Sequence, residues 1–426
     1  MSNQLSDMAA HLTKLPTTKI SDQYAGIKAL GLLSDTSACG HYRLINIFNT
    51  LKRNGADVDW TPSQDFHKLL QYDLIIAPRQ HDVDTYEMLR ALQWEGKTVI
   101  YEIDDDLFTV RPTNPAYNVY HPGAESLVYV EKFLRNSNGV TVTTPELAHA
   151  YSRFNSNISI LPNFIDFSIR NWACDVEWEK GHPTFNVKRI KKAAEFEDKV
   201  VIGWAGGVSH LEDLRQIINP LRNILNKYDN VIFAFYGDIN LFNAVDPSGM
   251  LDRAKVVHVK PRHFLDFPEG LFGVDIGLCP ILGCEFNLSK SCLKPLEMMA
   301  AGQAVIASNV GPYSRLAKTH PGLIQLVGNS PGTTTWEDAM SYLIENNELR
   351  SELQLEGRRV VVSHYSLETN YHHWPTHWNQ LALRSQQGMT APAQNIKPLW
   401  GNIERNAECP CGSKKKYKRC CVTSHG

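Results

Sequence analysis

The sequence predicts an α/β protein built from two doubly wound lobes. Short apolar strands alternate with periodic helices over residues 27–165 and again over residues 199–365, and an aperiodic polar stretch separates the two runs. Such alternation is typical of a parallel sheet with helices on both faces. A length of 426 residues allows two full-sized cores, and a mix of 43% hydrophobic and 21% charged residues indicates that most of the chain folds.

The first run begins with an apolar strand at residue 27, a glycine-containing loop and a helix that stops at Gly55. YDLIIAP and KTVIYEI have the continuous apolar character of buried strands, and DTYEMLRALQWEG between them has helical periodicity. Helix, strand and helix patterns follow as far as ISILPNFID. We expect residues 27–165 to form the first lobe and residues 166–198 to form the linker.

The second run starts with the strand KVVIGWAGG and continues through a long helix and the strands NVIFAFYG, KVVHV and GVDIGLCPI. The helix KSCLKPLEMMAAG and the strand QAVIASNVG come next, and residues 336–365 read as one closing helix. The remaining segments are expected to be an N-terminal extension (1–26), a helix that follows the second lobe (366–385), a tether (386–404) and a cysteine-rich tail (405–426).

Charge and hydropathy exclude two broad classes of protein. A formal net charge of −2 argues against a chain-wide binder of nucleic acid, which needs a surplus of Lys and Arg. The first twenty residues lack the apolar core of a signal peptide, and no stretch reaches the roughly 18 apolar residues of a membrane span. We therefore expect a cytoplasmic protein without a transmembrane segment.

Two facing parallel sheets would leave a cleft lined by the carboxyl ends of their strands, where open α/β sheets bind ligands. In VVIGWAGGVSHLEDL, Gly206 and Gly207 stand between a strand and a helix, where bare backbone N–H groups can approach a phosphate. Ser209 is expected to cap that helix. A tight turn that merely requires glycine explains the pair equally well.

A second group of polar residues lies in FNLSKSCLKPLEMMAAGQAVIAS. Lys290, Lys294 and Glu297 follow at four- and three-residue spacings, which places them on one face if the segment is a helix. Lysine suits a pyrophosphate, glutamate can accept hydrogen bonds from two ribose hydroxyls, and Ser291 adds a hydroxyl near the helix start. The alternative is an exposed helix face with ordinary charge pairing.

This segment resembles the donor-binding helix of GT-B glycosyltransferases, close to the large retaining family that reads E-x7-E before a small-residue segment and a strand. Glu297 matches the second Glu, whereas Ser289 stands at the position of the first and Glu285 lies four residues earlier. LPNFID, GWAGGVSHLEDL and VDIGLCPI match further segments of that family. The resemblance spans about residues 27–385 and implies two Rossmann-like lobes.

The resemblance implies that the chain transfers a hexosyl group from a nucleotide-diphosphate sugar to a hydroxyl of a glycan, lipid-linked or cell-envelope acceptor, with retention favoured. It assigns ribose contact to Glu297 and diphosphate neutralisation to Lys290 and Lys294. It also implies that the helix from Ser366 crosses back to the first lobe. A nucleotide-sugar epimerase or hydrolase on the same fold, and a degenerate transferase serving as an adaptor, are the alternatives.

In the first lobe, the loop SACGHYRL carries candidate contacts. Gly40 lets the backbone turn, His41 titrates near neutrality, and Arg43 can hold a phosphate or carboxylate with two hydrogen bonds. The resemblance places this loop near the diphosphate and the acceptor. His41 could equally be a loop histidine without a role.

Three aspartates, Asp104, Asp105 and Asp106, follow the strand KTVIYEI. We rank acceptor contact first, with Asp105 as the candidate, then capping of the next turn, and a divalent metal last. Two-lobed enzymes stabilise a leaving diphosphate with Lys, Arg and helix dipoles, so no catalytic metal is expected. His121 in NVYHPG is a further loop candidate.

The tail RNAECPCGSKKKYKRCC concentrates four of the nine cysteines, namely Cys409, Cys411, Cys420 and Cys421. Four thiolates satisfy tetrahedral zinc, so we expect a structural Zn²⁺ site whose folding depends on the metal. The run resembles the SEC-C motif known from the preprotein-translocase ATPase, over about residues 405–421. Its basic residues suggest docking to an acidic protein, a ribosome or nucleic acid, or else a solvated charge run.

Overall fold

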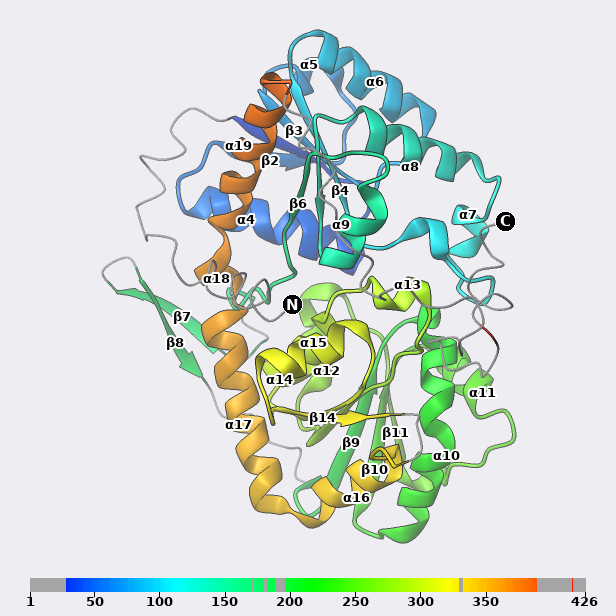
Figure 1. Cartoon of the computed structure of the whole chain (residues 1–426). Helices are drawn as coiled ribbons and strands as arrows, with labels where there is room; N and C mark the ends of the chain where they lie inside the picture. Colours follow the sequence, from blue (N-terminus) through cyan, green and yellow to red (C-terminus); the bar gives the residue numbers. More distant parts are fainter. Residues whose placement is uncertain are drawn as a thin grey trace.

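The computed structural model describes residues 28–169, 172, 174–179, 182–187, 196–328, 332–388 and 416. Two lobes lie one above the other, and each is built on a six-stranded sheet (Figure 1). Every strand pair within the two sheets is parallel. The predicted α/β class with two doubly wound lobes is confirmed.

The first sheet has the order β2-β1-β3-β4-β5-β6. Its strands are β1 (Ala29–Leu32), β2 (Val58–Thr61), β3 (Leu74–Pro78), β4 (Thr98–Ile103), β5 (Gly139–Val142) and β6 (Ile158–Ile160). Its helices are α3 (Ala38–Gly40), α4 (Asn46–Arg53), α5 (Phe66–Leu69), α6 (Val83–Trp94), α7 (Tyr117–Tyr120), α8 (Glu125–Asn136) and α9 (Pro145–Tyr151). The chain runs outward from β1 to β2 and returns to β3, so the winding direction reverses between β1 and β3.

The second sheet has the order β11-β10-β9-β12-β13-β14. Its strands are β9 (Val200–Ala205), β10 (Val231–Tyr236), β11 (Val256–Val259), β12 (Ile276–Cys279), β13 (Ala304–Ser308) and β14 (Ile324–Val327). Its helices are α10 (Leu211–Lys227), α11 (Ile239–Val245), α12 (Phe267–Leu271), α13 (Glu285–Leu288), α14 (Leu293–Ala300), α15 (Gly311–Thr319), α16 (Trp336–Glu345) and α17 (Asn347–His364). The winding reverses between β9 and β12, the kind of position where open sheets bind ligands.

The sequence patterns missed four strands: β2 and β14, which lie at the edges of the six-stranded sheets, and the two strands of a hairpin within the expected linker, β7 (Cys174–Glu179) and β8 (His182–Val187). β2 and β14 are four residues long, and the two middle residues of each are only half-buried. By contrast, all six residues of β9 and of β10 are buried. A strand covered on both faces needs an apolar residue at every position, whereas an edge strand does not, so its apolar run is too short to recognise.

The single helix expected over residues 336–365 is wrong. It is two helices, because Asn346 adopts a non-helical conformation (φ −109°, ψ 81°) between α16 and α17. The Arg350 guanidinium donates hydrogen bonds to the carbonyl oxygens of Leu343 and Ile344 at 2.6 and 3.1 Å. A side chain of α17 thereby satisfies carbonyls that the end of α16 leaves without an intrahelical partner.

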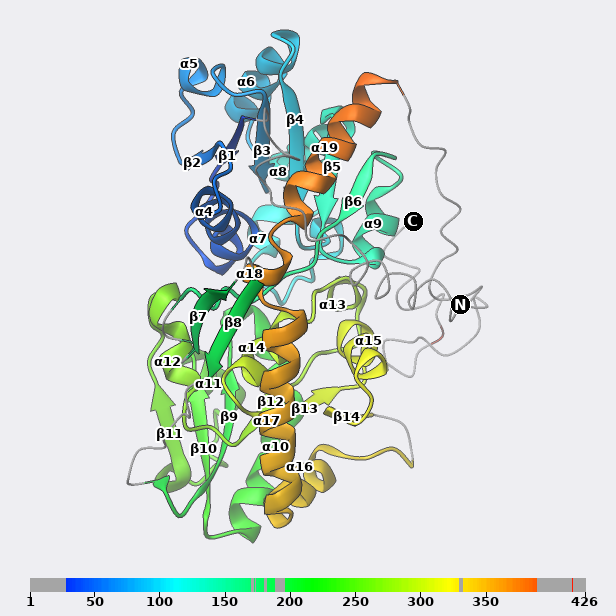
Figure 2. The same cartoon turned by 90° about the vertical axis from the view of Figure 1, so that its left-hand side faces the viewer.

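The chain crosses between the lobes twice, and the two crossings are hydrogen-bonded to each other. Ile165 N–H donates to the Tyr365 carbonyl oxygen and Leu367 N–H donates to the Ile165 carbonyl oxygen, both at 2.8 Å. The second crossing continues through α18 (Leu367–Asn370) into α19 (His373–Gln386). The first crossing leads to a hairpin of β7 (Cys174–Glu179) and β8 (His182–Val187), which stands outside both sheets beside α18 (Figure 2).

α19 packs against the first lobe although it follows the second lobe in sequence (Figure 1). Its buried residues Trp374, Trp378 and Leu381 join the apolar cluster formed by β1, β3 and α4. A Cβ atom at Gly139 of β5 would lie 2.9 Å from Leu381 Cβ, so only glycine allows this close approach. Among the described helices, none has the length and apolar composition that crossing a bilayer requires.

Candidate active site between the lobes

The carboxyl ends of strands from both sheets meet at the interface between the lobes. Three hydrogen bonds or ion pairs span it: Tyr42 Oη to Glu297 Oε1 at 2.8 Å, Lys290 Nζ to Asp105 Oδ1 at 3.5 Å, and Thr144 Oγ1 to the Ser289 carbonyl oxygen at 2.8 Å. Their first-lobe members follow β1, β4 and β5, and their second-lobe members follow β12. The region where these segments meet is called the interlobe site below.

The glycine pair predicted to contact a phosphate follows β9 at the point where the second sheet reverses its winding. A Cβ at Gly206 would lie 2.7 Å from the Trp204 ring and 3.0 Å from Lys294 Nζ, so the backbone passes very close to both side chains. A Cβ at Gly207 would meet no heavy atom of the described residues within 4 Å. Gly206 is therefore required by local packing, whereas Gly207 borders open space.

The expectation that Ser209 caps the following helix is wrong. Ser209 is exposed and lies inside the short 3₁₀ turn Val208–His210. The helix α10 begins after that turn, at Leu211, with His210 in the N-cap position. The extra turn displaces Ser209 from the helix start.

The segment carrying the two lysines is not one helix, which corrects the prediction of a common helical face. α13 ends at Leu288 and α14 begins at Leu293, so Lys290 and Ser291 lie in the connection between them. Lys294 and Glu297 are both on α14. The break directs Lys290 toward the first lobe, where its ammonium group meets the Asp105 carboxylate.

Lys294 and Glu297 are ionisable side chains in a largely buried environment. The Lys294 ammonium donates a hydrogen bond to the Ala205 carbonyl oxygen and lies 5.3 Å from the centre of the Trp204 ring. Burial lowers the pKa of Lys294. Burial also raises the pKa of Glu297 to about 7, against the opposing effects of Lys294 and of the Tyr42 hydroxyl. Burial therefore shifts the pKa of each group in the direction that favours its neutral form.

Of the three clustered aspartates, Asp105 alone pairs with the second lobe. Burial raises its pKa, but Lys290 and Arg79 outweigh burial and the pKa of Asp105 is lowered overall. Asp104 pairs with Arg79 at 3.4 Å within the first lobe. Asp106 accepts a hydrogen bond from the Phe108 N–H as the cap of a 3₁₀ turn, which is the capping role considered for this cluster.

A divalent metal site was the last-ranked possibility for these three aspartates. Within the described part of the chain, no group of three or more His, Cys, Asp or Glu side chains is arranged to hold a metal ion. Two of the three aspartates instead pair with cations, Asp104 with Arg79 and Asp105 with Lys290. Their carboxylate charges are thus compensated by protein groups.

The Arg43 side chain is buried within the first lobe, and its expected contact with a phosphate or carboxylate of the substrate stays a prediction. Its side chain is 2% exposed, and Nε donates to the equally buried Glu102 at 2.8 Å. Its Nη1 donates to Asn163 Oδ1 at 2.8 Å, and Asn163 Nδ2 donates in turn to Ser291 Oγ at 3.0 Å. A chain of polar contacts thus runs from the core of the first lobe, through the first interlobe crossing, to the connection before α14.

The remaining first-lobe candidates are placed by packing. The expected loop is helical, because Gly40 ends α3 and residues 41–45 form a π-helical turn that leads into α4. A Cβ at Gly40 would lie 1.9 Å from the Asp35 carbonyl oxygen, so this turn requires glycine. His41 is 7% exposed and stacks on Phe264 of the second lobe, with ring centres 4.2 Å apart. Burial lowers the pKa of His41. The sequence left open whether His41 contacts the substrate or has no role, and the structure adds that its ring packs against the opposite lobe.

A histidine and aspartate pair in the loop after β9 was missed. His210 Nδ1 lies 2.8 Å from Asp213 Oδ2, and Asp213 is 3% exposed. The other carboxylate oxygen, Oδ1, accepts hydrogen bonds from Leu282 N–H at 2.7 Å and from Asn287 Nδ2 at 3.1 Å. The i, i+3 spacing was visible in GGVSHLEDL, but the partners that orient Asp213 are about seventy residues away.

Two other predictions lie away from this interface or outside the described residues. The His121 ring contacts the carbonyl oxygen of its neighbour Pro122 at 3.1 Å. The four tail cysteines expected to hold zinc, Cys409, Cys411, Cys420 and Cys421, lie outside the described residues.

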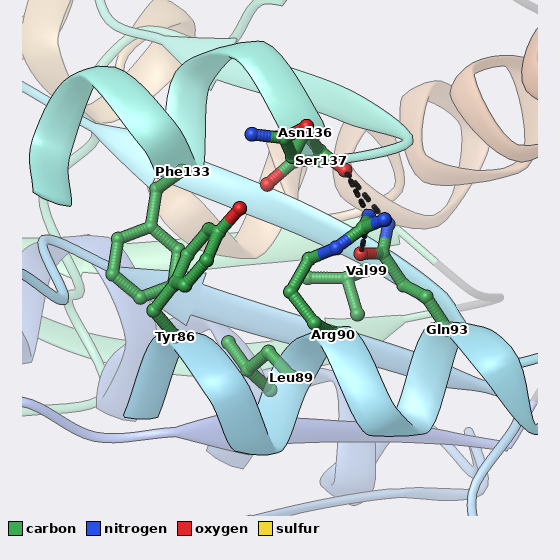
Figure 3. A pocket seen from close by; sticks show the side chains of 8 residues that line it. All are labelled: Tyr86, Leu89, Arg90, Gln93, Val99, Phe133, Asn136 and Ser137. Atoms are coloured by element: carbon green, nitrogen blue, oxygen red, sulfur yellow. Dashed lines mark hydrogen bonds between the residues drawn. The ribbon is translucent and has the colours of Figure 1, made fainter. Parts of the chain in front are cut away.

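A small pocket is found elsewhere, between α6 and α8 of the first lobe (Figure 3). Arg90 and Gln93 at its rim both donate hydrogen bonds to the Asn136 carbonyl oxygen, at 3.3 and 2.9 Å. Arg90 also donates to the Gln93 side chain at 2.7 Å. These polar groups are hydrogen-bonded to one another and connect α6 with α8. Their arrangement is therefore explained by the packing of the two helices.

Solved structures with the same architecture include several nucleotide-sugar enzymes. HepE from Anabaena, solved in complex with UDP and glucose, is 13% identical, with a TM-score of 0.52 over 85% of this chain and 100% of that one. The catalytic domain of starch synthase IV from Arabidopsis thaliana, bound to ADP and acarbose, is 11% identical, with a TM-score of 0.58 over 84% and 100%. Sucrose-phosphate synthase from Thermosynechococcus elongatus is 14% identical, with a TM-score of 0.55 over 83% and 99%.

Two sequence comparisons give matches of a different kind. Residues 405–421 match the SEC-C motif. A 92-residue stretch is 32% identical to the protein translocase subunit SecA of Azobacteroides pseudotrichonymphae, and it spans 20% of this chain and 8% of that relative. The chain therefore has the GT-B glycosyltransferase fold and carries a SEC-C motif at residues 405–421.

Proposed function

We propose that the protein is a glycosyltransferase that moves a sugar from a nucleoside-diphosphate sugar to an acceptor hydroxyl at the interlobe site. The observation that carries this proposal is the group of Lys290, Lys294 and Glu297 beside the bare backbone of Gly206 and Gly207. Two cations beside the open space at Gly207 suit a diphosphate, and a carboxylate one helical turn away suits the paired hydroxyls of a ribose. Ligands of the structural neighbours HepE and starch synthase IV are consistent with such a donor.

In this proposal, the second lobe binds the donor. Lys294 lies under the glycine loop, close enough to Gly206 to contact a phosphate that approaches the same backbone. Lys290 exchanges its ion pair with Asp105 for the diphosphate, since a group with two or more negative charges attracts the ammonium more strongly than one carboxylate does. Charge stabilisation of the leaving diphosphate is the main catalytic effect.

On the acceptor side, Asp105 is the residue that faces the diphosphate from the first lobe. Once Lys290 turns to the donor, Asp105 is left with a carboxylate 22% exposed at the interface. That carboxylate can accept a hydrogen bond from an acceptor hydroxyl. Arg43 supports this arrangement indirectly, because its contact to Asn163 holds the segment that carries Ser291.

Donor binding tests the assignment. Titration calorimetry with a panel of UDP-, ADP-, GDP- and dTDP-sugars should find a donor for the unmodified protein. Lys290→Ala and Glu297→Ala should each weaken its binding about tenfold or more, since a hydrogen bond to a charged group contributes about 1.5–3 kcal/mol. Lys227→Ala, at an exposed lysine at the far end of α10, is the matched control and should bind normally. Unchanged binding in both site variants would overturn the assignment.

The type of reaction is tested by the products. Mass spectrometry of a reaction with donor and a mixture of glycan and lipid-linked acceptors should show an acceptor heavier by one sugar. Free sugar or an isomerised donor without a glycosylated acceptor would instead identify a hydrolase or an epimerase on this fold.

For the SEC-C segment we propose a structural zinc site formed by Cys409, Cys411, Cys420 and Cys421. Its support is the match to the motif at residues 405–421 and the chemistry of four thiolates, which complete tetrahedral zinc without an open position. Elemental analysis of the purified chain should find about one zinc per chain. The metal should be lost when Cys409 and Cys411 are replaced by serine, and a zinc content unaffected by that change would refute the site.

A further inference from the structure

The His210 imidazole occupies a special place in the loop after β9. Its ring lies edge-on to the Trp204 indole, with ring centres 6.4 Å apart, and the Lys294 ammonium lies 5.3 Å from the centre of the same indole. Gly206 and Gly207, which border the proposed diphosphate position, precede His210 by a few residues. His210 N–H closes this loop by donating to the Gly207 carbonyl oxygen at 3.1 Å. The imidazole therefore lies close to Lys294 and to the glycine pair Gly206 and Gly207 of the interlobe site.

Asp213 fixes the orientation of this imidazole. Its carboxylate is buried and accepts hydrogen bonds from two further donors, Leu282 N–H on the loop after β12 and the Asn287 side chain on α13. An acceptor at 2.8 Å from Nδ1 requires the proton of the neutral ring to be on Nδ1. The other nitrogen, Nε2, is then an unprotonated base that can gain a proton without disturbing the contact to Asp213.

The charges around the ring disfavour that second proton as long as no anion is bound. Burial, and then the positive charges of Lys294 and Lys290, lower the pKa of His210 to about 4, although Asp213 opposes them. Asp105, across the interface, also interacts with His210, and Glu212 next to it is paired with Arg111 at 3.3 Å. Glu297 on α14 has a pKa raised to about 7, so its protonation also has to be considered.

We propose that His210 takes up a proton from solvent when a nucleoside-diphosphate sugar binds, and that its imidazolium then donates a hydrogen bond from Nε2 to the diphosphate. This inference rests on the proposed function. An arriving diphosphate compensates the two lysine charges, which removes the repulsion that keeps the ring neutral, and adds an anionic acceptor for Nε2. The proton returns to solvent when the nucleoside diphosphate leaves.

Proton uptake can be measured directly. For a donor found in the calorimetric panel, the binding enthalpy is recorded at one pH in buffers of different ionisation enthalpy, and the slope gives the number of protons taken up. The diphosphate of a nucleotide sugar has no group that titrates near pH 7, so the slope reports protein groups. The unmodified protein should take up more protons than His210→Asn, with a difference that approaches about one proton per site.

Two His210 variants and one control variant test whether the proton uptake depends on His210. Asparagine can place its amide N–H near the position of Nδ1–H and so retain the Asp213 contact, while it removes Nε2. Glutamine places its amide near Nε2 and should show the same loss of proton uptake with better donor affinity than asparagine. His320→Asn is the matched control, because His320 is also in the second lobe with a pKa lowered by burial, but it contacts Tyr365.

The outcomes separate the two proposals. Equal proton uptake in the unmodified protein and in both His210 variants overturns the role of His210 and leaves the glycosyltransferase proposal intact. Failure of every nucleotide sugar in the panel to bind the unmodified protein overturns both. Loss of uptake in His320→Asn as well would show that the effect is not specific to the loop after β9.

Discussion

In the first lobe, the Arg43 guanidinium and the Glu102 carboxylate are both 2% exposed and compensate each other at 2.8 Å. In the second lobe, Lys294 and Glu297 lie about one helical turn apart, and burial shifts the pKa of each toward its neutral form. His210 is shifted in the same way. Burial raises the pKa of Glu102 as well, but Glu102 has the Arg43 guanidinium as a direct partner. Lys294 instead donates to a backbone carbonyl oxygen, and Glu297 accepts from the Tyr42 hydroxyl.

The contrast between the lobes indicates how buried polar residues that stabilise the fold can be distinguished from those that serve function. A buried ion pair with its own hydrogen-bond partners stabilises only as a pair, and removal of one partner is costly. A group whose pKa is shifted by burial costs stability in its charged form, and such groups concentrate at functional sites. Replacing them should therefore leave stability unchanged or increase it while function is lost. Substitutions at Arg43, Glu297 and Gly207 test this contrast between the lobes, in order of decreasing effect on stability.

The largest effect is expected in the first lobe. Arg43→Ala should lower the free energy of unfolding by about 3–5 kcal/mol, because it leaves the Glu102 carboxylate buried without its cation. Urea unfolding followed by circular dichroism measures this loss. Lys52→Ala, which breaks the exposed pair with Asp59, is the control and should cost about 0–1 kcal/mol.

A double variant tests whether the loss of stability comes from the unpaired Glu102 charge. Arg43→Met combined with Glu102→Leu removes both charges and should recover most of the stability lost in Arg43→Ala, since apolar side chains of similar size often replace a buried ion pair at little cost. A double variant as unstable as the single one would show that the link from Arg43 to Asn163, and not the charge balance, is what stabilises this region.

A smaller effect of opposite sign is expected for Glu297→Gln. The pKa of Glu297 in the folded protein, about 7, is above the value of an exposed glutamate. Its contribution to stability is therefore fully present below pH 4.5 and is lost as pH rises through about 7. Glutamine does not ionise, so at pH 8 the variant should be more stable than the unmodified protein by about 1–2 kcal/mol.

Thermal or urea unfolding at pH 5 and pH 8 tests the Glu297 prediction, with donor binding measured in parallel. The difference between variant and unmodified protein should grow with pH. If Glu297→Gln were less stable at pH 8, the Tyr42 hydrogen bond would outweigh the cost of burying the carboxylate, and the contrast between the lobes would fail at this residue.

The smallest effect on stability is expected at Gly207, where a methyl group has room. Gly207→Ala should change the free energy of unfolding by less than about 0.5 kcal/mol but weaken donor binding about tenfold, because the added methyl occupies the approach to the backbone. Gly206→Ala should cost about 1–3 kcal/mol, since its Cβ would overlap the Trp204 ring. Normal donor binding by Gly207→Ala would move the phosphate position away from this loop.

Local patterns were sufficient to predict the parallel sheets, because buried strands such as β9 and β10 need an apolar residue at every position. They also located Lys294 and Glu297, whose i, i+3 spacing brings them together on α14 as on any helix. They failed for Lys290, because the helix start at Leu293 depends on how residues 289–292 contact the first lobe. Thr144 and Asn163 make those contacts.

Local sequence patterns were enough to predict the buried strands of both sheets, the glycine loop, the α14 pair and the SEC-C segment, since each of these rests on residues close together in the chain. The tertiary structure alone decided that Arg43 is buried with Glu102, that Asp105 meets Lys290 and that Asp213 orients His210. The first two join residues 59 or more positions apart, and the third relies on partners about seventy positions away. Which charge compensates which depends on packing between distant segments, and no local spacing encodes it.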